Sequence, residues 1–239
     1  SCRKEKNLEF GDRLIRGEIV KSYKKLILDV KFREGGVVPV FCPELDYMQN
    51  LYVPGTEIWV VKNRDRRRRL RYECQIVNSG GGLIMVNPNH VDALFTEAFE
   101  NGKIEELRKY TGIDRVDGNF ATRNINYELS NDAGEKCYVY LVSIYNKKGP
   151  NVVFPTMLNF YEMELFDEMR HLREKGAETA VLLLATRMDC LAAKFSWEVN
   201  PIAAAKIYDE AKNGLKFFCY GCNIDNKSIS ITKKMKILY

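Results

Sequence analysis

Histidine is scarce in this 239-residue chain, and its scarcity limits the metal chemistry available. His90 and His171 are the only two histidines, and neither forms a spaced pair with a cysteine. Cys219 and Cys222 have the CxxC spacing of a redox motif or of half a zinc site, but zinc would need a second pair of ligands. We therefore expect no bound metal or cofactor, and we interpret the CxxC as buried thiols or a fortuitous pair.

Long apolar runs are also missing. The longest candidate, residues 180–185, is flanked by Glu178 and Arg187 and has the length of a strand, whereas a bilayer-spanning helix needs roughly 18 apolar residues. This pattern predicts a soluble protein without a transmembrane segment. No signal peptide or amphipathic presequence can be read, and the start at Ser1 rather than Met leaves open that an upstream segment has been removed.

Cysteine is present in an odd number, and its members are widely scattered. This usage is typical of a reducing compartment, the cytoplasm or an organellar matrix, because stable disulfides need an oxidising environment. The seven are Cys2, Cys42, Cys74, Cys137, Cys190, Cys219 and Cys222.

Positive charge is concentrated in the first third of the chain. The formal net charge is +5, yet the first 85 residues hold 17 basic and 11 acidic side chains. Much of the excess is one basic run, which consists of Lys62, Arg64, Arg66, Arg67, Arg68, Arg69 and Arg71. Such a run could contact phosphates, form a solvated hairpin, or make a rim that binds ribosomal RNA or an acidic protein partner.

Residues 1–86 read as a small β domain. Short apolar runs end at turn residues, as expected for strands. Five or six such strands in about seventy residues favour a Greek-key barrel of the OB type. The predicted strands are 14–20, 25–30, 37–41, 57–61, 72–77 and 83–86. Aromatic side chains in them could stack on bases or fill the core; these are Tyr23, Tyr52, Trp59 and Tyr72.

Residues 87–239 alternate helices with strands, which predicts an α/β domain with a mixed sheet and right-handed crossovers. Apolar positions at helical spacing, or capping residues, predict helices over 91–100, 103–110, 159–175 and 201–213. Strands are predicted over 125–129, 138–144, 180–185 and 215–220.

Several short motifs in a shared order resemble the sugar fermentation stimulation protein A (SfsA) family. They are Cys42-Pro43 with the Pro54-Gly55 to Val60 step, the segment from Asn87 to Leu107, Phe154-Pro155, Phe195-Ser196, and the unit from Pro201 to Tyr220. Residues 44–46 depart from the family pattern. The resemblance implies that the second domain is similar to PD-(D/E)xK nucleases.

In that family, an Asp and the next strand's Glu-Val-Lys build the nuclease-like site, which holds a divalent metal against the scissile phosphate. Here Asn126 stands where the Asp would, and Tyr140-Leu141-Val142 replaces Glu-Val-Lys. Residues 156–162 have lost their family charges too. Glu97 is the one acidic group left near that site, and we interpret it as a solvated helix residue.

The resemblance and the substitutions together predict a pseudo-nuclease with no catalytic residues. We expect a non-catalytic protein that binds DNA or RNA through the basic run. An alternative is a structural subunit of a larger complex, such as an organellar ribosome or a membrane-protein assembly, because packing can persist when chemistry is lost. An active metal-dependent nuclease is the third hypothesis.

Overall fold

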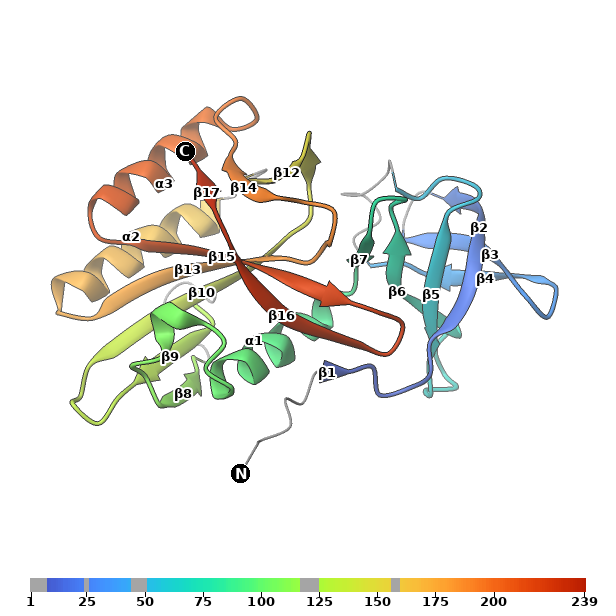
Figure 1. The fold of residues 1–239 in the computed structure, drawn as a ribbon, viewed down its shortest axis with the longest axis horizontal. Helices are drawn as coiled ribbons and strands as arrows, with labels where there is room; N and C mark the ends of the chain where they lie inside the picture. The colour runs from blue at the N-terminus through green and yellow to red at the C-terminus, as the bar shows by residue number, and fades with distance from the viewer. Residues whose placement is uncertain (1–7, 24–25, 44–50, 117–124, 156–159) are drawn as a thin grey trace. The chain divides into compact units, whose positions relative to one another are not determined.

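The computed structural model describes residues 8–23, 26–43, 51–116, 125–155 and 160–239, with the backbone alone for 160–162 (Figure 1). The chain forms two compact units. One comprises Ser1–Glu97, Thr186–Asp189 and Cys222–Ile231, and the other comprises Ala98–Ala185, Cys190–Gly221 and Thr232–Tyr239. None of the helices in the described ranges has the length and apolar character that membrane spanning requires.

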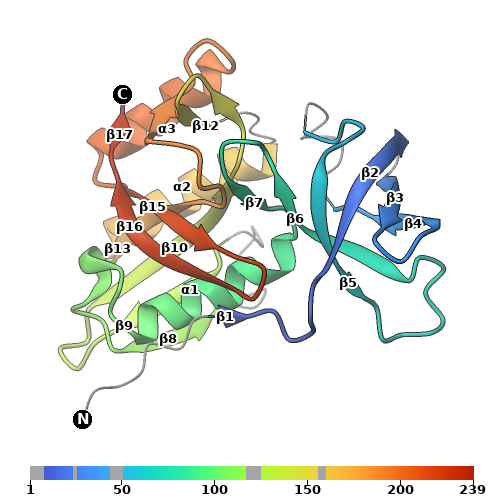
Figure 2. The same ribbon diagram turned by 45° about the vertical axis from the view of Figure 1, so that its right-hand side comes forward.

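The first unit holds a closed five-stranded barrel. Its strands are β2 (Ile15–Tyr23), β3 (Ile27–Phe32), β4 (Val37–Phe41), β5 (Glu57–Lys62) and β6 (Tyr72–Asn78). They pair in the order β4-β3-β2-β5-β6, and a parallel bridge between Phe41 and Glu73 joins β4 to β6 and closes the ring (Figure 2). This connectivity confirms the predicted OB-type barrel. Strand β7 (Leu83–Met85) pairs with β6 after the glycine-rich turn.

The barrel core follows the alternation of the strands, in which every second side chain points inward. The inward residues Leu28, Val30, Ile58, Val60, Cys74 and Ile76 are all fully buried. Tyr52 is also only 1% exposed, so this tyrosine belongs to the core and not to a stacking surface.

Gly17 of β2 allows β3 to approach closely, and this predicts a stability effect. A Cβ atom at this position would lie 2.5 Å from Val30 Cγ1 and 3.0 Å from two ring carbons of Phe32. Overpacking of this kind typically costs about 1–3 kcal/mol. We expect Gly17→Ala to lower the free energy of unfolding by that amount in urea. Gly11→Ala is the matched control, because nothing lies within 4 Å of its Cβ position; equal stability of the two variants would contradict the account.

The second unit is built on a mixed sheet, as predicted. Strands β10 (Lys136–Ile144), β13 (Glu178–Ala185) and β15 (Lys216–Ile224) run parallel, whereas β9 (Tyr127–Ser130) and β8 (Gly112–Arg115) continue the sheet antiparallel. In the sheet order, β16 (Ser228–Met235) follows β15, and β1 (Leu8–Glu9) follows β16. A smaller sheet has the order β11 (Lys147–Lys148), β12 (Asn151–Phe154), β14 (Ala192–Phe195) and β17 (Ile237–Leu238).

Helices α2 (Phe160–Glu174) and α3 (Pro201–Lys212) lie side by side against the parallel strands (Figures 1 and 2). Leu165, Phe166 and Met169 of α2 are fully buried in the core cluster that also contains Val181 of β13. Asn200 caps α3 as its side chain accepts a bond from Ala203 N at 3.1 Å. Both helices, and α1 (Val91–Glu100), agree with the sequence prediction.

The predicted helix over residues 103–110 is wrong. Only a 3-10 turn, Glu105–Leu107, forms there. Tertiary bonds explain the difference, since Lys109 Nζ and Tyr110 Oη both donate to the carboxylate of Glu178, at 2.9 and 2.8 Å. These bonds hold the segment against the start of β13 and outweigh a weak helical preference.

The same Glu178 carboxylate predicts a pH dependence of stability. Burial favours a higher pKa for Glu178, but bonds from Lys109, Lys216 and Tyr110 outweigh it and lower the pKa to about 2 from the ordinary 4.5. A depressed folded-state pKa stabilises the protein above the unfolded pKa and loses that contribution as the pH falls. We expect the advantage of the wild type over Glu178→Gln in free energy of unfolding to shrink as the pH falls from 4.5 toward 2. An advantage that does not change with pH in urea titrations would contradict this.

Candidate nucleic-acid interface

The basic run forms the loop that joins β5 to β6, and we call residues 62–71 the arginine loop. Its base is closed by Asn63 N donating to Arg71 O at 2.7 Å. Within it, Asn63 Oδ1 accepts from Asp65 N at 2.9 Å, and Asp65 Oδ1 accepts from Arg67 N at 3.0 Å. Such side-chain turns are typical of Asn and Asp. Two short polar side chains therefore satisfy the loop backbone and leave its long cationic side chains at the surface.

All seven cations of the arginine loop are exposed, and they are not equivalent. Arg64 is tied to Asp12, with Nε donating to Oδ2 at 3.1 Å, and its bond to Asp12 raises the pKa of the guanidinium. Arg67 Nε donates to Asp65 Oδ1 at 3.2 Å. No carboxylate in the described parts of the chain pairs with Lys62, Arg66, Arg69 or Arg71. The loop thus presents several cations whose charge is not neutralised locally.

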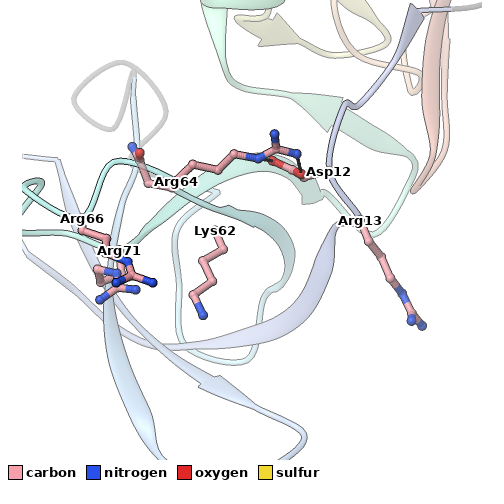
Figure 3. Close-up of a pocket in the computed structure, with 7 residues that line it drawn as sticks. Asp12, Arg13, Lys62, Arg64, Arg66 and Arg71 are labelled. Carbon is pink, nitrogen blue, oxygen red and sulfur yellow. Dashed lines mark hydrogen bonds and ion pairs between the residues drawn. The ribbon is translucent and has the colours of Figure 1, made fainter.

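Four of the cations gather around one surface depression of about 440 Å³. It is lined by Asp12, Arg13, Lys62, Asn63, Arg64, Arg66 and Arg71. Figure 3 shows Arg66 and Arg71 together on one side, the Arg64–Asp12 pair on another, and Arg13 directed away from them. The predicted residues Arg67, Arg68 and Arg69 are exposed on the loop outside this set of lining residues. Sequence reasoning missed Arg13 and Asp12, which are 49 or more residues before Lys62.

An aromatic pair lies beside the arginine loop. The rings of Phe32 and Tyr72 have centroids 5.2 Å apart at an interplanar angle of 50°, and both side chains are half-buried. Tyr72 directly follows Arg71 and is the strand partner of Lys62. Sequence analysis named Tyr72 but not Phe32, because 40 residues separate them and only the closure of the barrel brings them together.

Asn126, Tyr140 and Val142, where the resemblance predicts that nuclease groups are replaced, take part in the sheet and its core. Asn126 Oδ1 accepts a bond from Leu141 N at 2.6 Å, and Asn126 N donates to Val139 O at 3.0 Å. Tyr140 and Val142 of β10 are half-buried and pack against the core cluster of the second unit. Residues 44–48, Asn124 and 156–159 lie outside the described residues, as do the side chains of 160–162.

The bond from Leu141 to Asn126 predicts that Asn126 stabilises the sheet. Leu141 is 9% exposed, and a buried N–H without an acceptor costs about 1–3 kcal/mol. We expect Asn126→Ala to lower the free energy of unfolding by that amount in urea. Asn126→Asp keeps an acceptor and is expected to lose less. A fully stable Asn126→Ala protein would contradict this role.

Side chains that could bind a metal are not grouped in the described ranges. No group of three or more His, Cys, Asp and Glu side chains arranged to hold a metal occurs in the described ranges. Glu97 of α1 is half-buried and not the solvated residue expected from the sequence. Cys219 and Cys222 are both buried on β15, and burial raises the pKa of the Cys219 thiol to about 12. Residues three apart on a strand point to opposite faces, so this CxxC does not converge on one site.

Comparison with known proteins identifies the family. Residues 89–228 match the family model described as the sugar fermentation stimulation protein RE domain. A sugar fermentation stimulation protein homolog of Maricaulis maris is 26% identical over 231 residues, which cover 96% of this chain and 98% of the relative. Another, of Paramagnetospirillum magneticum, is 24% identical and covers 94% of this chain and 95% of its own length.

The fold agrees with this family. The structure of Pyrococcus furiosus SfsA in complex with Ca²⁺ is similar with a TM-score of 0.82 at 13% identity, covering 98% of this chain and 99% of that one. The resemblance inferred from short motifs is therefore confirmed across the chain. The protein described here belongs to the sugar fermentation stimulation protein (SfsA) family.

Proposed function

We propose that this chain is a non-catalytic nucleic-acid-binding protein whose principal contact is the arginine loop. The observation that carries the proposal is the position of that loop. In OB folds, the connection between the fourth and fifth barrel strands is one of the segments that bind oligonucleotides. Here that connection, from β5 to β6, carries six arginines and a single carboxylate, and Lys62 at the end of β5 adds a seventh cation.

The chemistry of the loop suits phosphates. Arginine offers a planar fork that binds phosphate oxygens in pairs, and each phosphate contact releases condensed counterions. Arg66 and Arg71 have no carboxylate partner among the described residues, and beside this depression they can contact the phosphates of a bound strand. Binding should therefore be tight at low salt and largely independent of sequence.

Fluorescence anisotropy with a labelled oligonucleotide tests this part of the proposal. The measurement is made in EDTA, because the proposed contact needs no metal ion. We expect binding that weakens steeply as potassium chloride is raised. Absence of binding to both single-stranded and double-stranded probes at low salt would refute the function.

The proposal that the protein does not cleave rests on the nuclease-like positions. Mg²⁺ and Ca²⁺ are held mainly by carboxylate oxygens. At these positions the chain has Asn126, Tyr140 and Val142. The amide oxygen of Asn126 already accepts a bond from Leu141 N, and Tyr140 and Val142 pack against the core. This donor set does not fit a divalent cation, even though the Pyrococcus furiosus relative is described in complex with Ca²⁺.

A cleavage assay separates the pseudo-nuclease from an active enzyme. Purified protein is incubated with labelled DNA or RNA in Mg²⁺ or Mn²⁺, beside a Glu97→Gln variant. We expect intact substrate with both proteins. Cleavage by the wild type that Glu97→Gln abolishes would overturn the proposal.

A structural role in a larger complex is the second candidate, and exposed apolar side chains in the second unit favour it. Trp197, Val199, Ile202 and Tyr208 are 41%, 52%, 76% and 40% exposed, and the rings of Trp197 and Tyr208 are 5.8 Å apart. Exposed clusters of this kind often mark protein interfaces. Purification of the endogenous protein as a free monomer would count against this candidate.

A further inference from the structure

We infer that the Phe32–Tyr72 pair is a base-stacking site, and that the ligand of the barrel is a single-stranded nucleic acid. This inference rests on the proposed function, since it assigns a substrate class to the same surface. It depends on where the two rings lie in the barrel and on what surrounds them.

The pair belongs to a layer that caps one mouth of the barrel. Val30, Val60 and Cys74 are fully buried inside it. Phe32, Lys62 and Tyr72 lie two positions from these residues on the same faces of β3, β5 and β6. The two aromatic side chains are half-buried and the lysine is exposed. The last layer of the core therefore consists of two partly exposed aromatic rings and a lysine. A layer that only closed the barrel would contain apolar side chains and no cation.

Gly17 shapes this mouth. It is the strand partner of Phe32, and the Phe32 ring carbons lie only 3.0 Å from where its Cβ would be. The glycine lets the ring lie close over β2, where a larger residue would displace it. The aromatic surface is thus built by three strands that meet only in the closed barrel.

Basic side chains adjoin both rings. Lys62 and Arg71, the neighbours of Tyr72, line the depression of the arginine loop (Figure 3). Phe32 lines a second depression of about 500 Å³ together with Arg16, Lys31 and Arg33 and with two carboxylates, Glu18 and Glu57. Glu57 pairs with Arg16, so Lys31 and Arg33 are the cations that remain for phosphates on this side. Phosphate-binding groups therefore occur on each side of the rings, which is the arrangement that stacking proteins use to follow a single strand.

Single strands fit this arrangement better than duplexes. Stacking on a protein ring requires an exposed base face, and paired bases in a duplex hide theirs within the stack. Base stacking is tolerant of sequence because every base has a π-face. The predicted ligand is a single strand of either sugar type, held by phosphate contacts and by at least one stacked base.

The test compares an oligothymidylate of about 12 nucleotides, within the range that one OB fold covers, with an abasic strand of equal length and charge. We expect the wild type to bind the strand with bases on the order of 10-fold more tightly. Tyr72→Leu should bind both strands equally, whereas Tyr72→Phe should keep the preference. An oligouridylate and a duplex complete the set, and the duplex should bind more weakly than either single strand.

The outcomes separate the two proposals. If neither strand binds, the proposed function fails. If both bind equally to the wild type, or if Tyr72→Leu keeps the preference, the stacking site fails while phosphate binding stands. Circular dichroism confirms that the variants fold. A readout that needs no variant is the fluorescence of 2-aminopurine placed in the strand, which stacking on the pair should quench and which would stay unchanged without it.

Discussion

Replacing Arg66, Arg67, Arg68 and Arg69 with glutamine is expected to weaken binding of a single-stranded oligonucleotide roughly 100-fold or more at about 0.1 M salt. Each lost phosphate contact removes a share of the counterion release that drives binding. All four side chains are exposed on the arginine loop, so their removal should leave the barrel core intact. Fluorescence anisotropy at constant salt measures the effect.

The control variant removes the same number of positive charges at positions outside the arginine loop. Lys175, Lys227, Lys233 and Lys236 are all exposed and outside the arginine loop. Their replacement by glutamine produces the same change in net charge, and we expect it to alter affinity by less than about 5-fold, since charges that make no phosphate contact are screened at this salt. Equal losses in the two variants would mean that net charge, and not the loop, determines binding.

Removal of the Glu210 carboxylate is expected to cost the largest amount of stability, about 3–5 kcal/mol, because Arg173 and Lys206, whose side chains are only 11% and 19% exposed, lose their buried partner. Glu210 is fully buried in α3 and accepts from Arg173 at 2.6 Å, from Lys206 at 3.1 Å and from Arg170. The change Glu210→Ala, followed by urea unfolding, measures this cost. Neighbouring Asp209 also pairs with Arg170 but is 61% exposed, so Asp209→Asn should cost less than about 1 kcal/mol.

A Glu210→Ala protein as stable as Asp209→Asn would contradict this role. The network also shows why a charged helix face is difficult to interpret from sequence. A glutamate among basic residues has the same pattern whether it faces solvent or is enclosed. Only the packing of α2 against α3 brings Arg170 and Arg173 to Glu210.

Local patterns predicted much of the barrel, because alternating apolar residues and turn residues act over a few positions. The position of the arginine run between two strands was readable for the same reason. The Phe32–Tyr72 pair was not, since it depends on the closure between β4 and β6. Short strands such as β8 and β14 carry too few residues to show a period of two, and the sequence analysis missed them.

At the nuclease-like positions, the sequence indicated the residue types but not their structural role. The resemblance predicted that nuclease groups are replaced at Asn126, Tyr140 and Val142, but residue types alone did not indicate what these side chains do. The structure gives Asn126 a bond to the β10 backbone and gives Tyr140 and Val142 contacts with the core. Such packing supports the proposal that this part of the sheet now serves stability.

The salt dependence of binding tests the central claim most directly. For single strands, the slope of the logarithm of affinity against the logarithm of salt concentration is about −0.7 per neutralised phosphate. If the arginine loop holds the phosphates, the slope of the wild type should be steeper than that of the four-arginine variant by up to about 3, and the lysine control should keep the wild-type slope. Equal slopes for the wild type and the four-arginine variant would contradict the claim that this protein binds nucleic acid through the loop.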